Sequence, residues 1–180
     1  IAIAAPCDYS EFAMMLEYAI TIHDGPIAIR YPKGIWKEKL FENDQLNFGK
    51  GVKIKTGKDV TIAAVGSMVE TALKVAEILE SAGIDAEVIN ARFVKPLDSS
   101  LLINSVSSTK RLVTLEDNVI KGGFGSGVLE LLSQNGIYYP VKIFGFPDEP
   151  ILHGSRNEIF RKYKMDVQSI SEEIRKFVAS

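Results

Sequence analysis

Apolar runs typical of buried strands alternate with amphipathic helical segments along most of this sequence, and that alternation restricts the fold more than any other feature. The run "VTIAAVGS" (60–67) is almost continuously apolar, as in a strand covered on both faces. The next segment carries apolar residues at helical spacing, which form one stripe: Val69, Ala72, Leu73, Ala76 and Leu79. Strands alternating with helices predict an α/β fold, a three-layer sandwich with a mostly parallel sheet and right-handed crossovers.

The alternation continues to the end of the sequence. Further segments assigned in this way are strands in "VKI" (52–54), "SAGIDAEVIN" (81–90), "RLVTLED" (111–117) and "YPVKIFGFPD" (139–148), and a closing helix in "SISEEIRKFV" (169–178). The first of these strands is expected to be half-exposed, because its apolar residues alternate with lysine.

Polar residues mark three helix starts. Asp8, with Glu11 three residues later, is a capping-box pattern that opens a helix in "YSEFAMMLEYAITIH" (9–23). Ser67 and Asp98 each stand directly before a segment with helical spacing. Both side chains are therefore expected to cap the helix that follows.

The pattern is interrupted once, by the charged and aperiodic stretch "WKEKLFENDQL" (36–46). We therefore predict two units: residues 1–35 come from the edge of one α/β domain, 36–46 form a linker, and 47–180 make a complete second domain. The sequence opens with Ile1 inside the strand-like run "IAIAAP". We expect this chain to be a fragment of a longer protein.

Charge and cysteine content exclude several classes of function. The formal net charge of −2 and the pI of about 5.8 provide no basic field for nucleic acid or an anionic membrane, so neither partner is expected. Cys7 is the single cysteine, which excludes an internal disulfide and favours a reducing, cytoplasmic setting. With one Cys and two widely spaced His residues, a zinc site is not expected.

The stretch "GPIAIRYPKG" (25–34) is the strongest candidate for a binding site. An apolar strand over Ile27–Arg30 leads directly into Tyr31, Pro32 and Lys33. Loops that follow buried strands present side chains to ligands in α/β proteins, and Pro32 would stiffen this loop. An Arg fork matches a phosphate and Lys adds a point charge. A surface ion pair at a domain boundary explains Arg30 and Lys33 equally well from the residues alone.

A second candidate is the glycine cluster Gly122–Gly127 between a strand and a helix, together with Glu116 and Asp117 before it. Free N–H groups at such a turn can bind phosphate, but neither a Walker loop nor a dinucleotide fingerprint is present. A tight turn that lets the helix pack on the sheet is the favoured interpretation. Glu116 and Asp117 lie where ligands approach open sheets, although solvated or interface carboxylates are the favoured assignment.

The remaining chemistry-bearing residues have simple structural interpretations. His153 is expected to make a loop hydrogen bond before a helix, and His23 to stand at a helix C-terminus. Cys7 is expected to be a small buried side chain, and Trp36 to cover the seam between the two units.

At "AIRYPKG" the chain resembles the 1-deoxy-D-xylulose-5-phosphate synthases, a thiamine-diphosphate-dependent family of the transketolase superfamily. The resemblance continues, in the family's order, through "IAIAAPCDYSEFAMML", "INARFVKPLD", "LEDNVIKGGFGSGV" and "GFPDEPILHGS". It implies that residues 1–35 are the tail of a pyrimidine-binding domain and that 47–180 form a transketolase-like C-terminal domain. "RFVKPLD" and the Gly-rich turn are typical of the superfamily, whereas "RYPKG" with "GFPDEPILHG" is more particular to the synthases.

The resemblance implies a longer enzyme that condenses pyruvate with D-glyceraldehyde 3-phosphate to 1-deoxy-D-xylulose 5-phosphate and CO2, a precursor of isoprenoids, thiamine and pyridoxal. Arg30, Tyr31 and Lys33 would bind the substrate phosphate; family members commonly have Arg where this chain has Lys33, and Lys lacks the bidentate fork. Thiamine diphosphate and Mg2+ would be held by motifs this sequence lacks. No catalytic, cofactor or metal residue is therefore assigned, and the chain alone is expected to be inactive and to bind no cofactor.

The same resemblance implies a homodimer. Three alternatives remain open at this point: the β subunit of a 2-oxo-acid dehydrogenase, a freestanding dimerisation or regulatory module without activity, and a transketolase that acts on two sugar phosphates.

Overall fold

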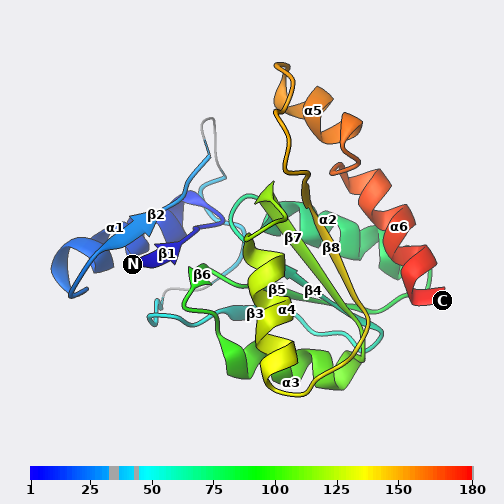
Figure 1. Ribbon diagram of the computed structural model, residues 1–180, viewed down its shortest axis with the longest axis horizontal. Helices are drawn as coiled ribbons and strands as arrows, with labels where there is room; N and C mark the ends of the chain where they lie inside the picture. The colour runs from blue at the N-terminus through cyan, green and yellow to red at the C-terminus, as the bar shows by residue number, and fades with distance from the viewer. Residues whose placement is uncertain (33–36, 43–44, 180) are drawn as a thin grey trace.

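The structure, a computed structural model, describes residues 1–32, 37–42 and 45–179, which form two β-sheets and six helices (Figure 1). Lys33, Trp36 and the predicted boundary between residues 35 and 36 lie outside the described residues. No helix in the described part of the chain is both long enough and apolar enough to cross a membrane.

The larger sheet has five strands, and its inner strands run parallel. In spatial order they are β3 (Val52–Lys55), β5 (Ala86–Asn90), β4 (Val60–Ala64), β7 (Leu112–Val119) and β8 (Val141–Phe146). Only β3 pairs antiparallel, with β5, at one edge. Every residue of β4 and β5 is buried, which confirms that "VTIAA" is a strand covered on both faces.

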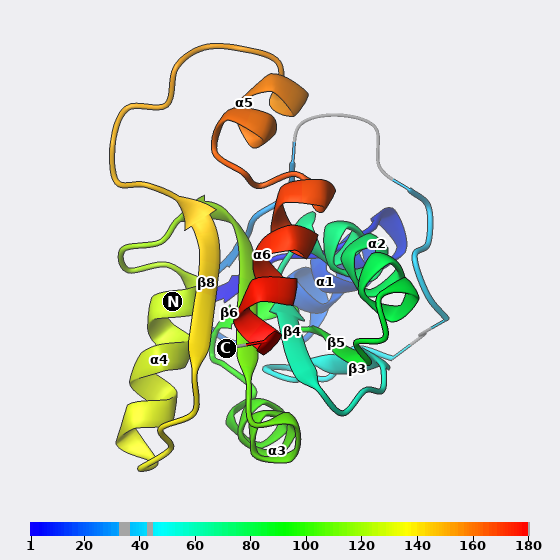
Figure 2. The same ribbon diagram turned by 90° about the vertical axis from the view of Figure 1, so that its right-hand side faces the viewer.

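Helices cover both faces of this sheet, which confirms the predicted three-layer α/β sandwich (Figure 2). On one face, α2 (Met68–Ser81) packs beside α6 (Val167–Ala179), and on the other lie α3 (Ser99–Thr109) and α4 (Phe124–Gln134). The buried stripe of α2 contains the predicted Val69, Ala72, Ala76 and Leu79, with Leu73 only half-buried. The short helix α5 (Arg156–Lys162), expected after His153, projects beyond the sheet in Figure 1.

The smaller sheet joins the start of the chain to the segment that follows β5 of the larger sheet. Strand β1 (Ala2–Ala4) pairs parallel with β2 (Ile27–Ile29) and antiparallel with β6 (Phe93–Lys95). The sequence pattern did not reveal β6, because three residues are too few to show a period. Helix α1 (Tyr9–Thr21) links β1 to β2, as predicted.

The predicted caps fall into two groups. Asp8 and Asp98 cap α1 and α3, since their carboxylates accept from the N–H groups of Glu11 and Leu101 respectively. Ser67 stands at the start of α2 but makes no side-chain capping bond, so that prediction is wrong. Its hydroxyl instead donates to the Oδ2 atom of Asp117 at 3.2 Å, on a neighbouring strand.

A buried ion pair ties α1 to the turn between β5 and β6. The Nε atom of Arg92 donates to Oε1 of Glu11 at 2.6 Å, and Asn90 Nδ2 donates to both Glu11 oxygens at 3.0 Å. Arg92 is only 2% exposed and adopts a left-handed backbone with φ 60°. We call Glu11, Asn90 and Arg92 the buried joint. Only half of the predicted capping box is formed: Asp8 accepts from Glu11 N–H, whereas the Glu11 carboxylate accepts from Cys7 N–H and faces inward to form this joint.

Candidate functional site

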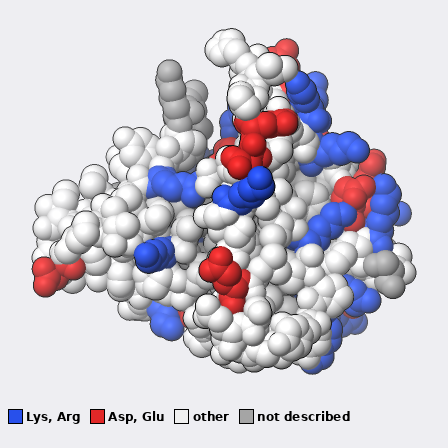
Figure 3. All heavy atoms as spheres, viewed as in Figure 1, with Lys and Arg blue, Asp and Glu red and all other residues white. Residues whose placement is uncertain are grey.

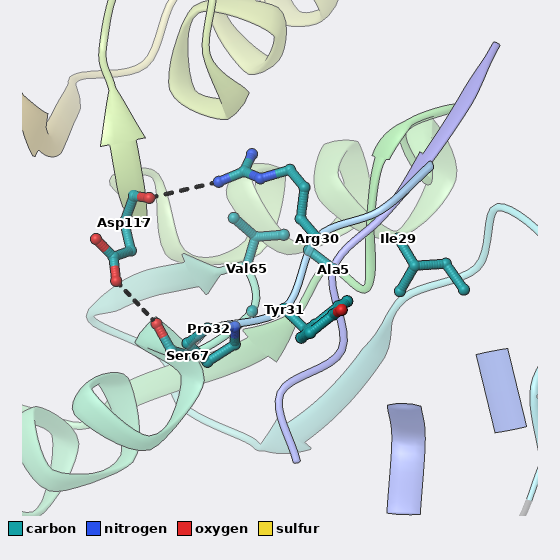
Figure 4. A pocket seen from close by; sticks show the side chains of 9 residues that line it. Ala5, Ile29, Arg30, Tyr31, Pro32, Val65, Ser67 and Asp117 are labelled. Atoms are coloured by element: carbon teal, nitrogen blue, oxygen red, sulfur yellow. Dashed lines mark hydrogen bonds between the residues drawn. The ribbon is translucent and has the colours of Figure 1, made fainter. Parts of the chain in front are cut away.

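A cavity of about 330 Å³ opens where β4 and β7 end and where the chain leaves β2 (Figure 4). We call it the strand-end cavity, and its lining residues are Ala5, Ile29, Arg30, Tyr31, Pro32, Val65, Gly66, Ser67 and Asp117. From β4 the chain crosses through α2 to β5, whereas from β7 it crosses through α4 to β8 on the opposite side. The cavity therefore lies at the point where strand order reverses, which is where open α/β sheets bind ligands.

Arg30 enters this cavity from the end of β2. Its backbone N–H donates to the carbonyl of Ala4 at 2.8 Å, which continues the β1–β2 pairing by one residue and fixes the start of the side chain. The Nη2 atom donates to the main-chain carbonyl of Asp117 at 3.4 Å, which is the only hydrogen bond of this guanidinium within the described residues (Figure 4). Among the described residues no carboxylate forms an ion pair with Arg30, although Glu116 lies near enough to interact with its charge, so the remaining N–H groups of Arg30 are available to an anion.

The other two residues predicted with Arg30 have different outcomes. Tyr31 lines the cavity, is 63% exposed, and packs its ring against Phe12 with 5.1 Å between centroids. Lys33 lies outside the described residues, so its proposed phosphate contact stays a prediction.

Asp117 is the polar centre of the cavity wall. Its carboxylate accepts from the Ser67 hydroxyl and, at 3.0 Å, from Nη2 of Arg156. The same Arg156 nitrogen lies 3.1 Å from the Ser67 hydroxyl oxygen, and the guanidinium stands 4.1 Å from the centre of the Phe160 ring. Sequence reasoning missed Arg156, because no local pattern around α5 relates this residue to Asp117, which lies 39 residues earlier at the end of β7.

Glu116, next to Asp117, is fully buried, so the predicted solvated or interface carboxylate is wrong at this position. It accepts from the N–H groups of Phe124 and Gly125, each at 2.9 Å, at the start of α4. Burial raises the pKa of Glu116 above its usual value, although these two backbone hydrogen bonds and nearby Arg30 oppose the increase.

The glycine cluster is confirmed as a tight packing turn. A Cβ atom at Gly123 would stand 2.3 Å from the Glu116 carboxylate, so a larger residue cannot fit there without movement. The helix N–H groups that could have received a phosphate are instead occupied by Glu116. This turn therefore offers no place for the diphosphate of a cofactor.

The remaining candidates do not join the cavity. His153 is exposed in the loop before α5, whereas His23 packs its ring against Tyr18 and Phe48, at 5.9 and 4.9 Å between centroids. Cys7 is half-buried and its sulfur accepts from Asn90 at 3.3 Å. Burial, with added repulsion from Glu11 and Asp8, raises the pKa of the Cys7 thiol, which disfavours a nucleophilic thiolate.

Possible metal ligands and surface charges are the last features that bear on a binding site. Within it, no group of three or more His, Cys, Asp or Glu side chains is arranged to hold a metal ion. Figure 3 shows one face of the molecule, on which basic and acidic side chains are interspersed. A nucleic-acid interface would gather Lys and Arg on one surface.

The fold and the position of the cavity define a transketolase-type α/β protein. Residues 49–170 match the family described as "Transketolase, C-terminal domain", and the chain belongs to this family. A solved structure titled "Split gene transketolase, inactive beta4 tetramer" superposes with a TM-score of 0.84 at 30% identity, covering 99% of this chain and 57% of that one. A transketolase from Pichia stipitis (the H261F mutant) superposes with a TM-score of 0.70 at 19% identity, covering 99% of this chain and 25% of that chain.

Curated relatives give a more particular likeness. The chain is 44% identical over 173 residues to the 1-deoxy-D-xylulose-5-phosphate synthase of Desulforudis audaxviator, covering 94% of this chain and 27% of that protein. It is 40% identical over 173 residues to the synthase of Heliobacterium modesticaldum, covering 95% of this chain and 27% of that protein. The chain thus spans about a quarter of the length of the curated relatives it matches.

Proposed function

We propose that this chain is part of a synthase that condenses pyruvate with D-glyceraldehyde 3-phosphate, releasing CO2 and forming 1-deoxy-D-xylulose 5-phosphate for isoprenoid, thiamine and pyridoxal synthesis. The curated relatives support the reaction, since they carry this enzyme name at 40–44% identity. The observation that carries the chain's own role is Arg30, whose guanidinium lines a cavity at the strand ends and lacks a carboxylate partner among the described residues.

The strand-end cavity is the proposed seat of the aldehyde's phosphoryl group. Arg30 would donate to two phosphate oxygens, because its fork matches their spacing and only one of its nitrogens is engaged, weakly, by a carbonyl. Tyr31 and Pro32 would form the wall of the site, and Lys33 would add a second positive charge. Binding this remote group orients the reacting aldehyde, so its free energy contributes to the chemical step as well as to affinity.

Thiamine diphosphate would supply the carbanion chemistry on pyruvate, and the residues of this chain do not fit it. The Gly-rich turn is occupied by the Glu116 carboxylate, which would repel a diphosphate. We therefore assign thiamine diphosphate and Mg2+ to other parts of the longer enzyme, and expect this chain by itself to be inactive.

Self-association is the proposed assembly, with a homodimer in the longer enzyme. Helix α1 exposes Tyr9, Leu16 and Ile20, at 59, 41 and 75%, on its outer side. These residues lie at helical spacing and form an apolar stripe that a partner surface would cover. The structural neighbour at 30% identity is itself described as a tetramer. Light scattering of the chain across a dilution series tests this: a monomer at all concentrations would contradict it.

Substitution of Arg30 in the longer enzyme tests the proposed function. Arg30→Ala should raise the KM for the phosphorylated aldehyde by ten- to a hundred-fold, about the 1.5–3 kcal/mol of a hydrogen bond to a charged group, with the KM for pyruvate little changed. Arg30→Lys should recover part of the loss, and Lys33→Ala should give a smaller rise. Lys74→Ala, an exposed cation paired with Glu70 on α2, is the matched control. An unchanged aldehyde KM in Arg30→Ala would reject the assignment.

A further inference from the structure

Two arginines that are far apart in the sequence converge on Asp117. Arg30 donates to its main-chain carbonyl from inside the strand-end cavity, and Arg156 donates to its carboxylate from α5. Arg156 does not line the cavity but contacts two residues that do, Ser67 and Asp117. The proposed phosphate site therefore contains a negative charge in its wall, and the residue that neutralises this charge stands outside it.

This arrangement has an electrostatic consequence for any anion that enters. A carboxylate in the wall of a small cavity repels a phosphoryl dianion, and near a protein surface such repulsion is large enough to control binding. With Arg156 seated on Asp117 the charges of this pair cancel, and the positive charge of Arg30 faces the ligand without opposition from Asp117. With Arg156 withdrawn, the Asp117 charge opposes Arg30, and the cavity attracts an anion less strongly.

We propose that Arg156 is a positioning residue for anion binding: by pairing with Asp117 it makes the strand-end cavity receptive to a phosphoryl group, so the placement of α5 controls affinity at that site. This inference rests on the proposed function for the location of the phosphate, but it concerns a different residue and a different element. Two features hold Arg156 in place. Its guanidinium stacks on Phe160, and α5 begins with a complete capping box between Ser155 and Glu158.

The coupling must also operate in reverse. If the Arg156–Asp117 pair favours the anion, the bound anion must favour the pair by the same factor, because the two equilibria are linked. Phosphate should therefore hold α5 against the strand ends. Amides in residues 147–162 should exchange more slowly with phosphate present, whereas those of α3, on the far side of the sheet, should not change.

The decisive experiment titrates this chain with inorganic phosphate in low-salt buffer, using calorimetry and amide NMR shifts. Arg156→Gln should weaken phosphate binding about tenfold. This is the effect expected when the negative charge of Asp117 is no longer neutralised and repels a phosphate several Å away, near a surface where salt screens the interaction. Asp117→Asn should bind at least as tightly as the unaltered chain. The double variant R156Q/D117N should recover binding to within about twofold, because removing the carboxylate removes the need for its neutraliser.

The controls separate this inference from simpler explanations. Arg161→Gln removes the same charge from the same helix without contacting Asp117, and should leave phosphate affinity unchanged. Failure of D117N to restore binding to R156Q overturns the inference, since it would mean direct contact or structural damage. An R156Q chain that binds like the unaltered one, or an unaltered chain that binds no phosphate, overturns it too. The proposed function fails separately, if Arg30→Ala leaves the aldehyde KM unchanged in the longer enzyme.

Discussion

The chain contains two arginine–carboxylate pairs whose surroundings differ completely. In the buried joint, Arg92 and Glu11 are 3 and 2% exposed at their side chains and lie 2.6 Å apart. At the strand-end cavity, Arg156 and Asp117 are 50 and 31% exposed and lie 3.0 Å apart. The chemical groups are nearly the same, so the contrast isolates the effect of water.

Burial decides what each pair can do. In the joint, neither charge can return to solvent without unfolding, so the pair fixes how α1 and β1 sit against β5 and β6. At the cavity, both groups can be solvated separately at little cost, so the pair can open and close. The buried pair is therefore suited to holding the loop that carries Arg30 in place, and the exposed pair to responding to a ligand.

The largest predicted effect comes from breaking the buried pair. Arg92→Met leaves the Glu11 carboxylate buried without its partner, and should lower the free energy of unfolding by about 3–5 kcal/mol. Urea unfolding monitored by circular dichroism measures this loss.

A double substitution sharpens the comparison. Replacing Glu11 and Arg92 together by methionine removes both charges and should recover most of the stability, because no unpaired charge remains. If the free energy of unfolding of the single R92M variant lies within about 1 kcal/mol of that of the unaltered chain, water reaches the buried joint. The two arginine–carboxylate pairs would then no longer differ in the way described above.

Glu116 gives the next largest effect, as a buried carboxylate with no direct ion pair among the described residues. Glu116→Ala leaves the N–H groups of Phe124 and Gly125 without an acceptor, and should destabilise by about 1–3 kcal/mol. The raised pKa of Glu116 means that the folded state holds its proton more tightly than the unfolded state. The stability that Glu116 contributes by holding its proton is therefore fully present below its usual pKa of 4.5. It is lost as pH rises through the higher pKa of the folded state.

Measuring the free energy of unfolding as a function of pH tests whether the pKa of Glu116 is raised in the folded state. The difference in unfolding free energy between the unaltered chain and Glu116→Gln, measured from pH 4 upward, should move against the unaltered chain as pH rises. A difference that moves in the opposite direction would show that hydrogen bonds outweigh burial at this carboxylate.

Much of the larger sheet could be predicted from the sequence, because its strands and helices are long enough to show a period. The strands β4, β5 and β7 stand out as apolar runs, and α2 as a stripe with 3.6-residue spacing. The smaller sheet was less accessible: β6 has three residues, and its pairing with β1 joins segments about 90 residues apart. Such contacts come from tertiary packing, which local patterns do not record.

The candidate site shows the same difference between features set by local sequence and features set by tertiary packing. Arg30 was identified because it follows an apolar strand directly, so local order predicts where its side chain begins. The buried position of Glu116 was missed, since its partners Phe124 and Gly125 lie on a helix whose approach depends on close packing at Gly123. Arg92 and Arg156 were missed as well, because each pairs with a carboxylate 39 or more residues away along the chain.

The helix cap Asp98 supplies a smaller effect with the opposite pH dependence. Asp98 accepts from Leu101 N–H and Ser100 Oγ at the start of α3, and from Gly51 N–H before β3. Burial tends to raise the pKa of Asp98, but hydrogen bonds from Ser100, Leu101 and Lys50 outweigh it and hold the pKa below the usual value. Asp98→Ala should cost about 1 kcal/mol at neutral pH, measured by thermal unfolding.

The lowered pKa of Asp98 sets the direction in which its contribution to stability changes with pH. That contribution is present above the usual pKa of 3.8 and is lost as pH falls through the lower pKa of the folded state. Glu116 and Asp98 both accept from helix N–H groups and both are buried, so opposite slopes in the two variants would attribute the difference to the additional hydrogen bonds at Asp98, including the one from Lys50. Parallel slopes would remove that explanation.

The smallest effect on stability is expected for the Arg156–Asp117 pair at the strand-end cavity. This effect tests most directly whether the exposed pair differs from the buried one. Arg156→Gln should change the free energy of unfolding by less than about 1 kcal/mol, because both groups are solvated when apart. Raising salt from 0.05 to about 0.5 M should reduce even this difference, since screening at that concentration acts over only a few Å. Paired thermal unfolding at the two salt concentrations, with Arg161→Gln as the matched variant, measures both quantities. A loss as large as that of Arg92→Met would mean that Arg156 holds the fold together, and a pair with that role could not open and close with a ligand.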